Sequence, residues 1–246
     1  MRDPGSRPRV VTFDCWNTLI CERDFAPARS QRLAALREAV ARHGKCVDTA
    51  ALEAAVAGAH QRHVDLWCAG IGSGSREMAT WALAAAGVDD AASAAALGRD
   101  FEEAGLAGEI EVLPGAGETL ERLASAGLRL ALVCDTGFSP GRIVRQMLAR
   151  GGLLEFLEVQ VFSDEVGVPK PHARMFEAAL APIAATPAAA MHVGDLRPTD
   201  VAGGRSYGMG TLRIRAVYDD CSDHPDADAV VDNHADLLSW LLERVR

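Results

Sequence analysis

The sequence lacks the features that mark several classes of protein. Its six cysteines are scattered without a C-x-x-C pair, which argues against a disulfide framework or a zinc site. No run of about 18 apolar residues occurs, and no apolar signal segment precedes the first apolar strand. No block of lysine and arginine is present that would follow a nucleic-acid backbone. These absences predict a cytoplasmic protein that binds neither membranes nor nucleic acids.

The composition that is present is that of an ordinary globular protein. The 246 residues are 49% hydrophobic and 24% charged, and the formal net charge is -9. This length provides the core of between one and two domains. Neither number indicates an oligomeric state.

Apolar runs and helical segments alternate through most of the chain. This alternation predicts a mostly parallel sheet with helices on both of its faces. The expected strands are 10–13, 128–134, 159–162, 189–193, 210–214 and 229–231. The expected helices of this part are 117–126, 141–149, 172–183, 201–207 and 235–245.

The segment 24–107 has a different character, because almost nothing in it resembles a strand. Apolar residues recur there at helical spacing in 30–43, 49–67, 75–87 and a fourth segment around Leu97, Phe101 and Ala104. Four consecutive amphipathic helices predict a small bundle with its own core. We therefore expect an α/β core domain formed by 1–23 and 108–246, and a helical cap domain formed by 24–107.

Polar side chains stand where four of the expected strands end. Asp14 follows the first strand, Lys170 lies beyond the third, and Asp195 with Asp200 follows the fourth. The second strand runs into a turn composed of Cys134, Asp135, Thr136 and Gly137. Parallel strands bring these ends to one edge of the sheet, where ligands bind. Two acidic strand ends held close together favour Mg²⁺, which also binds substrate phosphate. Lys170 and Thr136 would then contact the anion, and the Asp14 carboxylate would attack phosphorus.

Four motifs in this order resemble the haloacid dehalogenase-like (HAD) hydrolase superfamily. They are VVTFDCWNT, LALVCDTG, VPKP and MHVGDLRPTD, and the resemblance covers about 10–21 and 110–231. It implies a Rossmann-like, doubly wound α/β core with an inserted α-helical cap. It also implies a phosphatase of a small phosphorylated metabolite that forms an aspartyl-phosphate on Asp14. The implied Mg²⁺ ligands are Asp14, the backbone carbonyl of Trp16, Asp195 and Asp200. The implied substrate contacts are Cys134, Asp135, Thr136, Gly137 and Lys170.

Two positions depart from the family pattern. The second aspartate of the first motif, which in relatives acts as general acid and base, is Trp16 here. Losing such a group typically costs about 10²–10⁴ in rate, so we expect slow turnover. The serine or threonine of the second motif is Cys134, a poor hydrogen-bond donor, and Thr136 two residues later is its expected substitute.

Two other functions remain open. Relatives that hydrolyse carbon–halogen bonds also carry an aromatic residue at the position of Trp16, and they need a cap arginine, for which Arg29, Arg37 and Arg42 are candidates. The paired Asp195 and Asp200 instead favour a metal, which those dehalogenases do not use. A binding protein that retains the pocket without turnover is the third hypothesis. His60 and His63 lie three residues apart on a cap helix, where packing or pocket lining is the simpler interpretation than a metal site.

Overall fold

The computed structural model describes residues 8–245, so the first seven residues of the predicted core segment 1–23 lie outside the described part. The chain divides into two compact units. The first contains the described residues up to Cys21, Glu111–Asp135 and the chain from Leu148 onward, and the second contains Glu22–Ile110 and Thr136–Met147. No helix in the part of the chain that the structure describes is both long and apolar enough to span a membrane.

A six-stranded parallel sheet forms the centre of the first unit. Its spatial order is β5-β4-β1-β6-β7-β8, and each neighbouring pair runs parallel. The strands are β1 (Val10–Phe13), β4 (Arg129–Cys134), β5 (Val159–Phe162), β6 (Ala190–Gly194), β7 (Gly210–Ile214) and β8 (Ala229–Val231). The strand β1 therefore lies between β4 and β6, and the residues that follow these three strands meet at one edge. The predicted doubly wound α/β fold is confirmed.

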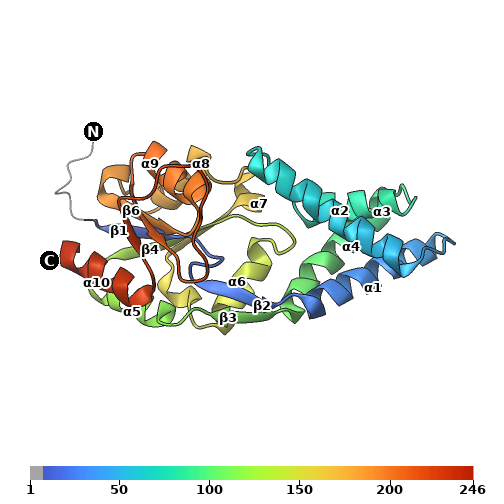
Figure 1. The fold of residues 1–246 in the computed structure, drawn as a ribbon, viewed down its shortest axis with the longest axis horizontal. Helices are drawn as coiled ribbons and strands as arrows, with labels where there is room; N and C mark the ends of the chain where they lie inside the picture. The colour runs from blue at the N-terminus through green and yellow to red at the C-terminus, as the bar shows by residue number, and fades with distance from the viewer. Residues whose placement is uncertain (1–7, 246) are drawn as a thin grey trace. The chain divides into compact units, whose positions relative to one another are not determined.

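Helices cover both faces of this sheet, as a continuous apolar sheet requires. Figure 1 shows α5 (Ala116–Ser125) and α10 (His234–Val245) together on one face, and α8 (Ala173–Leu180) and α9 (Ala202–Ser206) on the other. Met175, Phe176 and Ala179 of α8 pack into a buried cluster with Val133 of β4. Two further helices are α6 (Gly141–Arg150) and the short α7 (Ser163–Val166).

The second unit contains a bundle of four helices with its own core. They are α1 (Ala26–Arg42), α2 (Thr49–Cys68), α3 (Ser75–Ala85) and α4 (Ala91–Glu103). Leu36, Leu52, Met78, Leu97 and Phe101 are among the buried residues of that core. The expectation of four amphipathic helices is met, although α1 begins at Ala26, four residues earlier than predicted. The assignment of the bundle as a cap stays a prediction.

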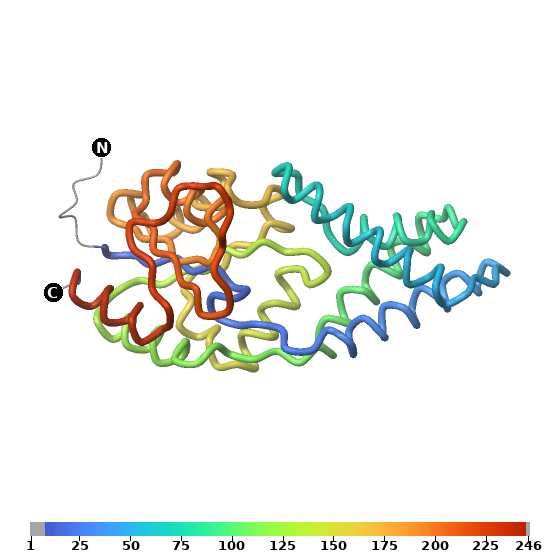
Figure 2. Tube along the Cα trace, viewed as in Figure 1, coloured from blue at the N-terminus to red at the C-terminus, as the bar shows by residue number. Residues whose placement is uncertain are grey.

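Two short strands, which the sequence analysis does not predict, lie where the chain passes between the units. They are β2 (Ile20–Asp24) and β3 (Glu109–Val112), and they pair with each other as a two-stranded sheet. Figure 2 shows these two segments, far apart in sequence, running side by side. Their sequences, ICERD and EIEV, carry charged residues that interrupt the apolar pattern of a buried strand.

Candidate active site

Asp14 directly follows β1. This strand lies between β4 and β6, and candidate site residues also stand at the ends of these two strands. Its backbone N–H donates to the carbonyl of Val193 on β6 (2.8 Å), which fixes where the strand ends. The carboxylate is buried, and its Oδ1 accepts a hydrogen bond from Lys170 Nζ at 2.5 Å. Burial raises the pKa of Asp14 well above its ordinary value, although the Lys170 ammonium opposes this shift.

Lys170 joins two of the predicted acidic residues. Its Nζ donates to Asp14 Oδ1 and to Asp200 Oδ1, the latter at 2.7 Å, and its side chain is 2% exposed. Its backbone N–H donates to Asp135 Oδ1 at 2.9 Å. Burial would lower the pKa of Lys170, but the carboxylates of Asp14 and Asp200 outweigh it and raise this pKa well above its ordinary value. The ammonium therefore stays charged and holds two carboxylates together.

Asp200 lies in a π-helical turn, Arg197–Val201, that follows β6. Its Oδ2 accepts the backbone N–H of Leu196 at 3.0 Å, so the carboxylate closes its own turn. Gly194 makes this possible, because a Cβ at that position would lie 2.3 Å from Asp200 Cγ. Position 194 therefore requires glycine, because the Asp200 side chain approaches its backbone closely.

Asp195 is the carboxylate without a cation in this cluster. Its Oδ2 is buried and has no hydrogen-bond partner among the described residues. Burial, together with the nearby carboxylate of Asp200, raises the pKa of Asp195 to about 7. Oxygen atoms of Asp14, Asp195 and Asp200 lie within 4.8 Å of one another. Lys170 bonds to two of these three buried carboxylates, and the third keeps an oxygen without a partner, so this donor set fits a hard cation such as Mg²⁺.

The chain turns sharply after Asp14, and Trp16 lies in this turn. Asn17 has a φ of 57° and donates its N–H to Ile20 (2.7 Å), while the N–H of Leu19 donates to Cys15 (2.8 Å). The Trp16 side chain is partly buried. An indole offers one N–H donor and no basic atom. Trp16 therefore cannot act as the general acid or base of this site.

The residues at the end of β4 and directly after it contact different partners. The Cys134 thiol is buried and donates to the carbonyl of Asp135 at 3.2 Å, and the Asp135 carboxylate holds the Lys170 backbone. The boundary between the two compact units falls between Asp135 and Thr136. Within the second unit, Gly137 lies against His63, whose Nε2 would be 2.8 Å from a Cβ at that glycine.

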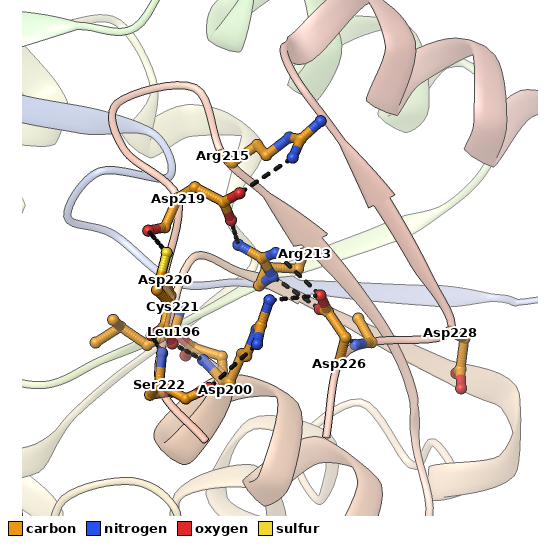
Figure 3. Close-up of polar contacts among 12 residues, drawn as sticks. Leu196, Asp200, Arg213, Arg215, Asp219, Asp220, Cys221, Ser222, Asp226 and Asp228 are labelled. Atoms are coloured by element: carbon orange, nitrogen blue, oxygen red, sulfur yellow. Dashed lines mark hydrogen bonds and ion pairs between the residues drawn. The ribbon is translucent and has the colours of Figure 1, made fainter. Parts of the chain in front are cut away.

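The loop between β7 and β8 is fixed by ion pairs (Figure 3). Arg213 is buried at the end of β7 and donates to both oxygens of Asp226 (2.8 and 3.0 Å) and to Asp219 (2.7 Å). Tyr218, which precedes Asp219, is hydrogen bonded to the carboxylate of Asp195 although 41% of its surface is exposed. Burial and the charge of Asp195 raise the pKa of Tyr218, so the hydroxyl keeps its proton and donates.

A family model of haloacid dehalogenase-like hydrolases matches residues 8–208. The chain belongs to this family. Haloacid dehalogenase-like hydrolase domain-containing protein 3 from Xenopus laevis is 26% identical over 84% of each chain. A glyceraldehyde 3-phosphate phosphatase from Methanopyrus kandleri is 35% identical, but the match spans only 52% of this chain and 54% of that protein.

Solved structures of HAD proteins share the fold. YfnB from Bacillus subtilis, in a magnesium-bound form, gives a TM-score of 0.67 at 18% identity and covers 96% of this chain and 99% of that one. A 2-haloacid dehalogenase from Pseudomonas syringae gives a TM-score of 0.64 at 25% identity, over 97% and 100% of the two chains. The predicted membership of the HAD superfamily is confirmed.

The sequence pattern did not single out Arg32, a buried cation of the second unit and a candidate functional residue of this HAD chain. Arg32 is buried in the second unit, where its Nε donates to the carbonyl of Phe101 and its guanidinium lies 4.3 Å from the centre of the Phe138 ring. His60 stacks on the same ring (5.6 Å between centroids). Burial lowers the pKa of Arg32 to about 10. Its position in the sequence could have indicated burial. Arg32 lies four residues after Ala28 and four before Leu36, on the buried face of α1.

The arginines and histidines proposed from the sequence have other surroundings. Arg29, Arg37 and Arg42 are exposed, and Arg37 donates to Thr49. His63 Nδ1 lies 2.8 Å from Ser73 Oγ, and His60 packs against Phe138. Among the residues that the structure describes, neither histidine belongs to a cluster able to hold a metal ion.

Proposed function

We propose that this HAD hydrolase is a Mg²⁺-dependent phosphatase of a small phosphorylated metabolite. The observation that carries the proposal is the unpartnered Oδ2 of Asp195 beside Asp14 and Asp200, the two buried carboxylates that already share the ammonium of Lys170. Relatives named as phosphatases of glyceraldehyde 3-phosphate and of ribulose-1,5-bisphosphate support the choice of phosphate esters, at 35% and 32% identity over about half of each chain.

Asp14 acts as the nucleophile in this proposal. A carboxylate oxygen forms a bond to phosphorus while the ester P–O bond breaks, and the alkoxide leaves with the bonding electrons and takes a proton from water, because Trp16 supplies no acid. Water then attacks the aspartyl-phosphate, which releases phosphate and restores the carboxylate. Asp14, Asp195, Asp200 and the backbone carbonyl of Trp16 would hold Mg²⁺, which would supply Lewis-acid stabilisation of the phosphoryl oxygens. Lys170 offsets negative charge at the same site, and Thr136 donates a hydrogen bond to the transferred group.

The test is a phosphate-release assay over a panel of small phosphorylated metabolites, with Mg²⁺ and with a chelator. We expect release that requires the metal and differs between substrates. Absence of release from every compound, with a folded protein that binds Mg²⁺, would overturn the proposal.

A second function, hydrolysis of 2-haloacids, is favoured by two observations. The aromatic Trp16 replaces the acid–base residue, and the chain is 25% identical to a 2-haloacid dehalogenase with which it shares the fold. Metal-independent halide release from 2-haloacids would support this alternative. The acidic cluster around Asp195 disfavours it, because a buried carboxylate oxygen without a partner is costly unless a cation binds there.

Replacing Trp16 with aspartate is expected to raise kcat for alkyl phosphate esters by about 10²-fold, because a carboxyl group can protonate the leaving alcohol. Aryl phosphates should gain less, since their leaving groups depart without protonation. Trp16→Phe is the matched control, which alters the side chain without adding a proton donor. Steady-state rates on one alkyl and one aryl ester measure the effect. A fall in rate with Trp16→Asp in folded protein would show that the indole has another role.

The affinity for Mg²⁺ is expected to depend on pH. Because the pKa of Asp195 is about 7, this carboxyl holds a proton below that pH and must release it when a cation binds. Apparent affinity should therefore be at least about tenfold weaker near pH 6 than near pH 8, since Asp195 must lose its proton and the raised pKa of Asp14 acts in the same direction. Calorimetric titration of metal-free protein at the two pH values measures this. Asp195→Asn should bind weakly at both, and an equal affinity of the native protein at both would contradict the prediction.

A further inference from the structure

His192 lies behind the acidic cluster, in the interior of the sheet. It is on β6, and its register partner on the neighbouring strand β1 is Thr12. Both side chains are fully enclosed, and Thr12 Oγ1 lies 2.8 Å from His192 Nδ1. The other ring nitrogen, Nε2, lies 3.1 Å from Asp200 Oδ1. A chain of contacts therefore runs from a core threonine through an imidazole to a carboxylate of the candidate active site.

The partners determine where the protons lie. Asp200 Oδ1 accepts a hydrogen bond from the Lys170 ammonium at 2.7 Å and Oδ2 accepts the backbone N–H of Leu196 at 3.0 Å, so both oxygens of this carboxylate act as acceptors. His192 Nε2 must then carry the hydrogen, which leaves Nδ1 as the acceptor for the Thr12 hydroxyl. The other acceptor near that hydroxyl, the carbonyl of Met191, is 3.5 Å away. We assign the tautomer on this basis.

The hydrogen bond from His192 reaches one particular oxygen of Asp200, Oδ1. Asp200 Oδ1 accepts from both His192 Nε2 and Lys170 Nζ, whereas Oδ2 accepts from the backbone N–H of Leu196. The same Nζ also bonds to Asp14. The orientation of the Asp200 carboxylate therefore sets the place of the ammonium that holds the nucleophile.

We propose that Thr12 and His192 form a positioning pair, in which the threonine hydroxyl holds the imidazole ring through Nδ1 and the imidazole orients Asp200 toward Lys170 and the bound cation. The inference deepens the proposed function and rests on it. Partners that orient metal ligands typically affect metal affinity or activity by about 10–100-fold. The competing explanation is that His192 only fills space, since Phe176 packs its ring edge-to-face at 5.1 Å.

Three substitutions of His192 separate these explanations. In His192→Gln the amide nitrogen replaces Nε2 and keeps the bond to Asp200. In His192→Asn the amide replaces Nδ1 and reaches only Thr12, and His192→Leu fills the space without polar atoms. We expect Mg²⁺ affinity and kcat to change within about threefold for the glutamine variant, and to fall by about 10–100-fold for the asparagine and leucine variants. Equal losses for glutamine and leucine, or none for asparagine in folded protein, would overturn the proposal.

Thr12 provides a second pair of variants that are gentler on the fold. Thr12→Val replaces the hydroxyl with a methyl group, and Thr12→Ser restores it. We expect valine to weaken Mg²⁺ binding by about tenfold and serine to recover it. Should valine and serine behave alike, the hydroxyl does not act through His192.

A measurement without metal keeps this inference separate from the proposed function. Nitrogen NMR of labelled His192 in metal-free protein shows which ring nitrogen bears the proton. The positioning pair requires the proton on Nε2 in the native protein, and a change in the Nδ1 chemical shift in Thr12→Val, because that nitrogen loses the Thr12 hydroxyl. A proton on Nδ1 in the native protein would overturn the inference, whereas a failure to bind Mg²⁺ with the expected tautomer present would overturn only the proposed function.

Discussion

Asp14→Asn is expected to lower phosphatase turnover by at least about 10³-fold while leaving the protein folded, because the amide cannot form the aspartyl-phosphate. The fold should tolerate the change because Asp14 lies beside two other carboxylates. Burial raises the pKa of Asp14, and the charges of Asp200 and Asp195 raise it further, so removing this charge relieves repulsion. Lys170 keeps its bond to Asp200 in the variant.

The control for this prediction is Asp89→Asn, which makes the same chemical change at an exposed position. Phosphate release by the control should equal that of the native protein, and thermal unfolding should show that all three proteins are folded. Retention of most activity by Asp14→Asn would mean that Asp14 is not the nucleophile.

Lys170→Met is expected to destabilise the metal-free protein by about 3–5 kcal/mol, because it leaves buried carboxylates without their cation. Nζ contacts both Asp14 and Asp200, and the side chain of each of these is less than 10% exposed. Denaturant unfolding near neutral pH measures the effect. The loss should shrink at lower pH, where Asp14 and Asp195, whose pKa values are raised, take up protons and need no cation.

The chain contains one other lysine, Lys45, which gives a matched control. Lys45 is exposed and donates to the carbonyl of Gly87. Lys45→Met should change the free energy of unfolding by no more than about 1 kcal/mol, as is usual for surface positions. Equal losses for the two methionine variants would contradict the interpretation that Lys170 holds the acidic cluster together.

The sequence predicts the parts of the fold that local pattern determines. Asp14, Lys170, Asp195 and Asp200 each follow a short apolar run, and parallel strands place such residues at one edge, which is where the structure places them. Their catalytic roles stay predictions. The position of Asp200 in a π-helical turn differs from the ordinary helix start expected at 201, and within this turn the Asp200 carboxylate accepts the backbone N–H of Leu196.

The features that sequence pattern misses depend on partners far apart in the chain. Thr12 and His192 are separated by 180 positions and meet only because β1 and β6 are neighbours. The segment Thr136–Met147 follows the α/β rhythm in sequence but belongs to the second unit, where Phe138 contacts Arg32 and Arg142 pairs with Glu102. No local pattern contains such pairings, since each needs the tertiary structure to bring its members together.

The most direct test of the account is to look for the phosphoryl group on Asp14 itself. The protein would be mixed with a phosphate ester that it hydrolyses, quenched within one turnover and digested, and the peptide containing Asp14 examined by mass spectrometry. We predict a phosphorylated Asp14 that forms with Mg²⁺ and is absent with chelator. Continued phosphate release with no modification of that peptide at any quench time, or an ester formed there from a 2-haloacid without metal, would contradict the account.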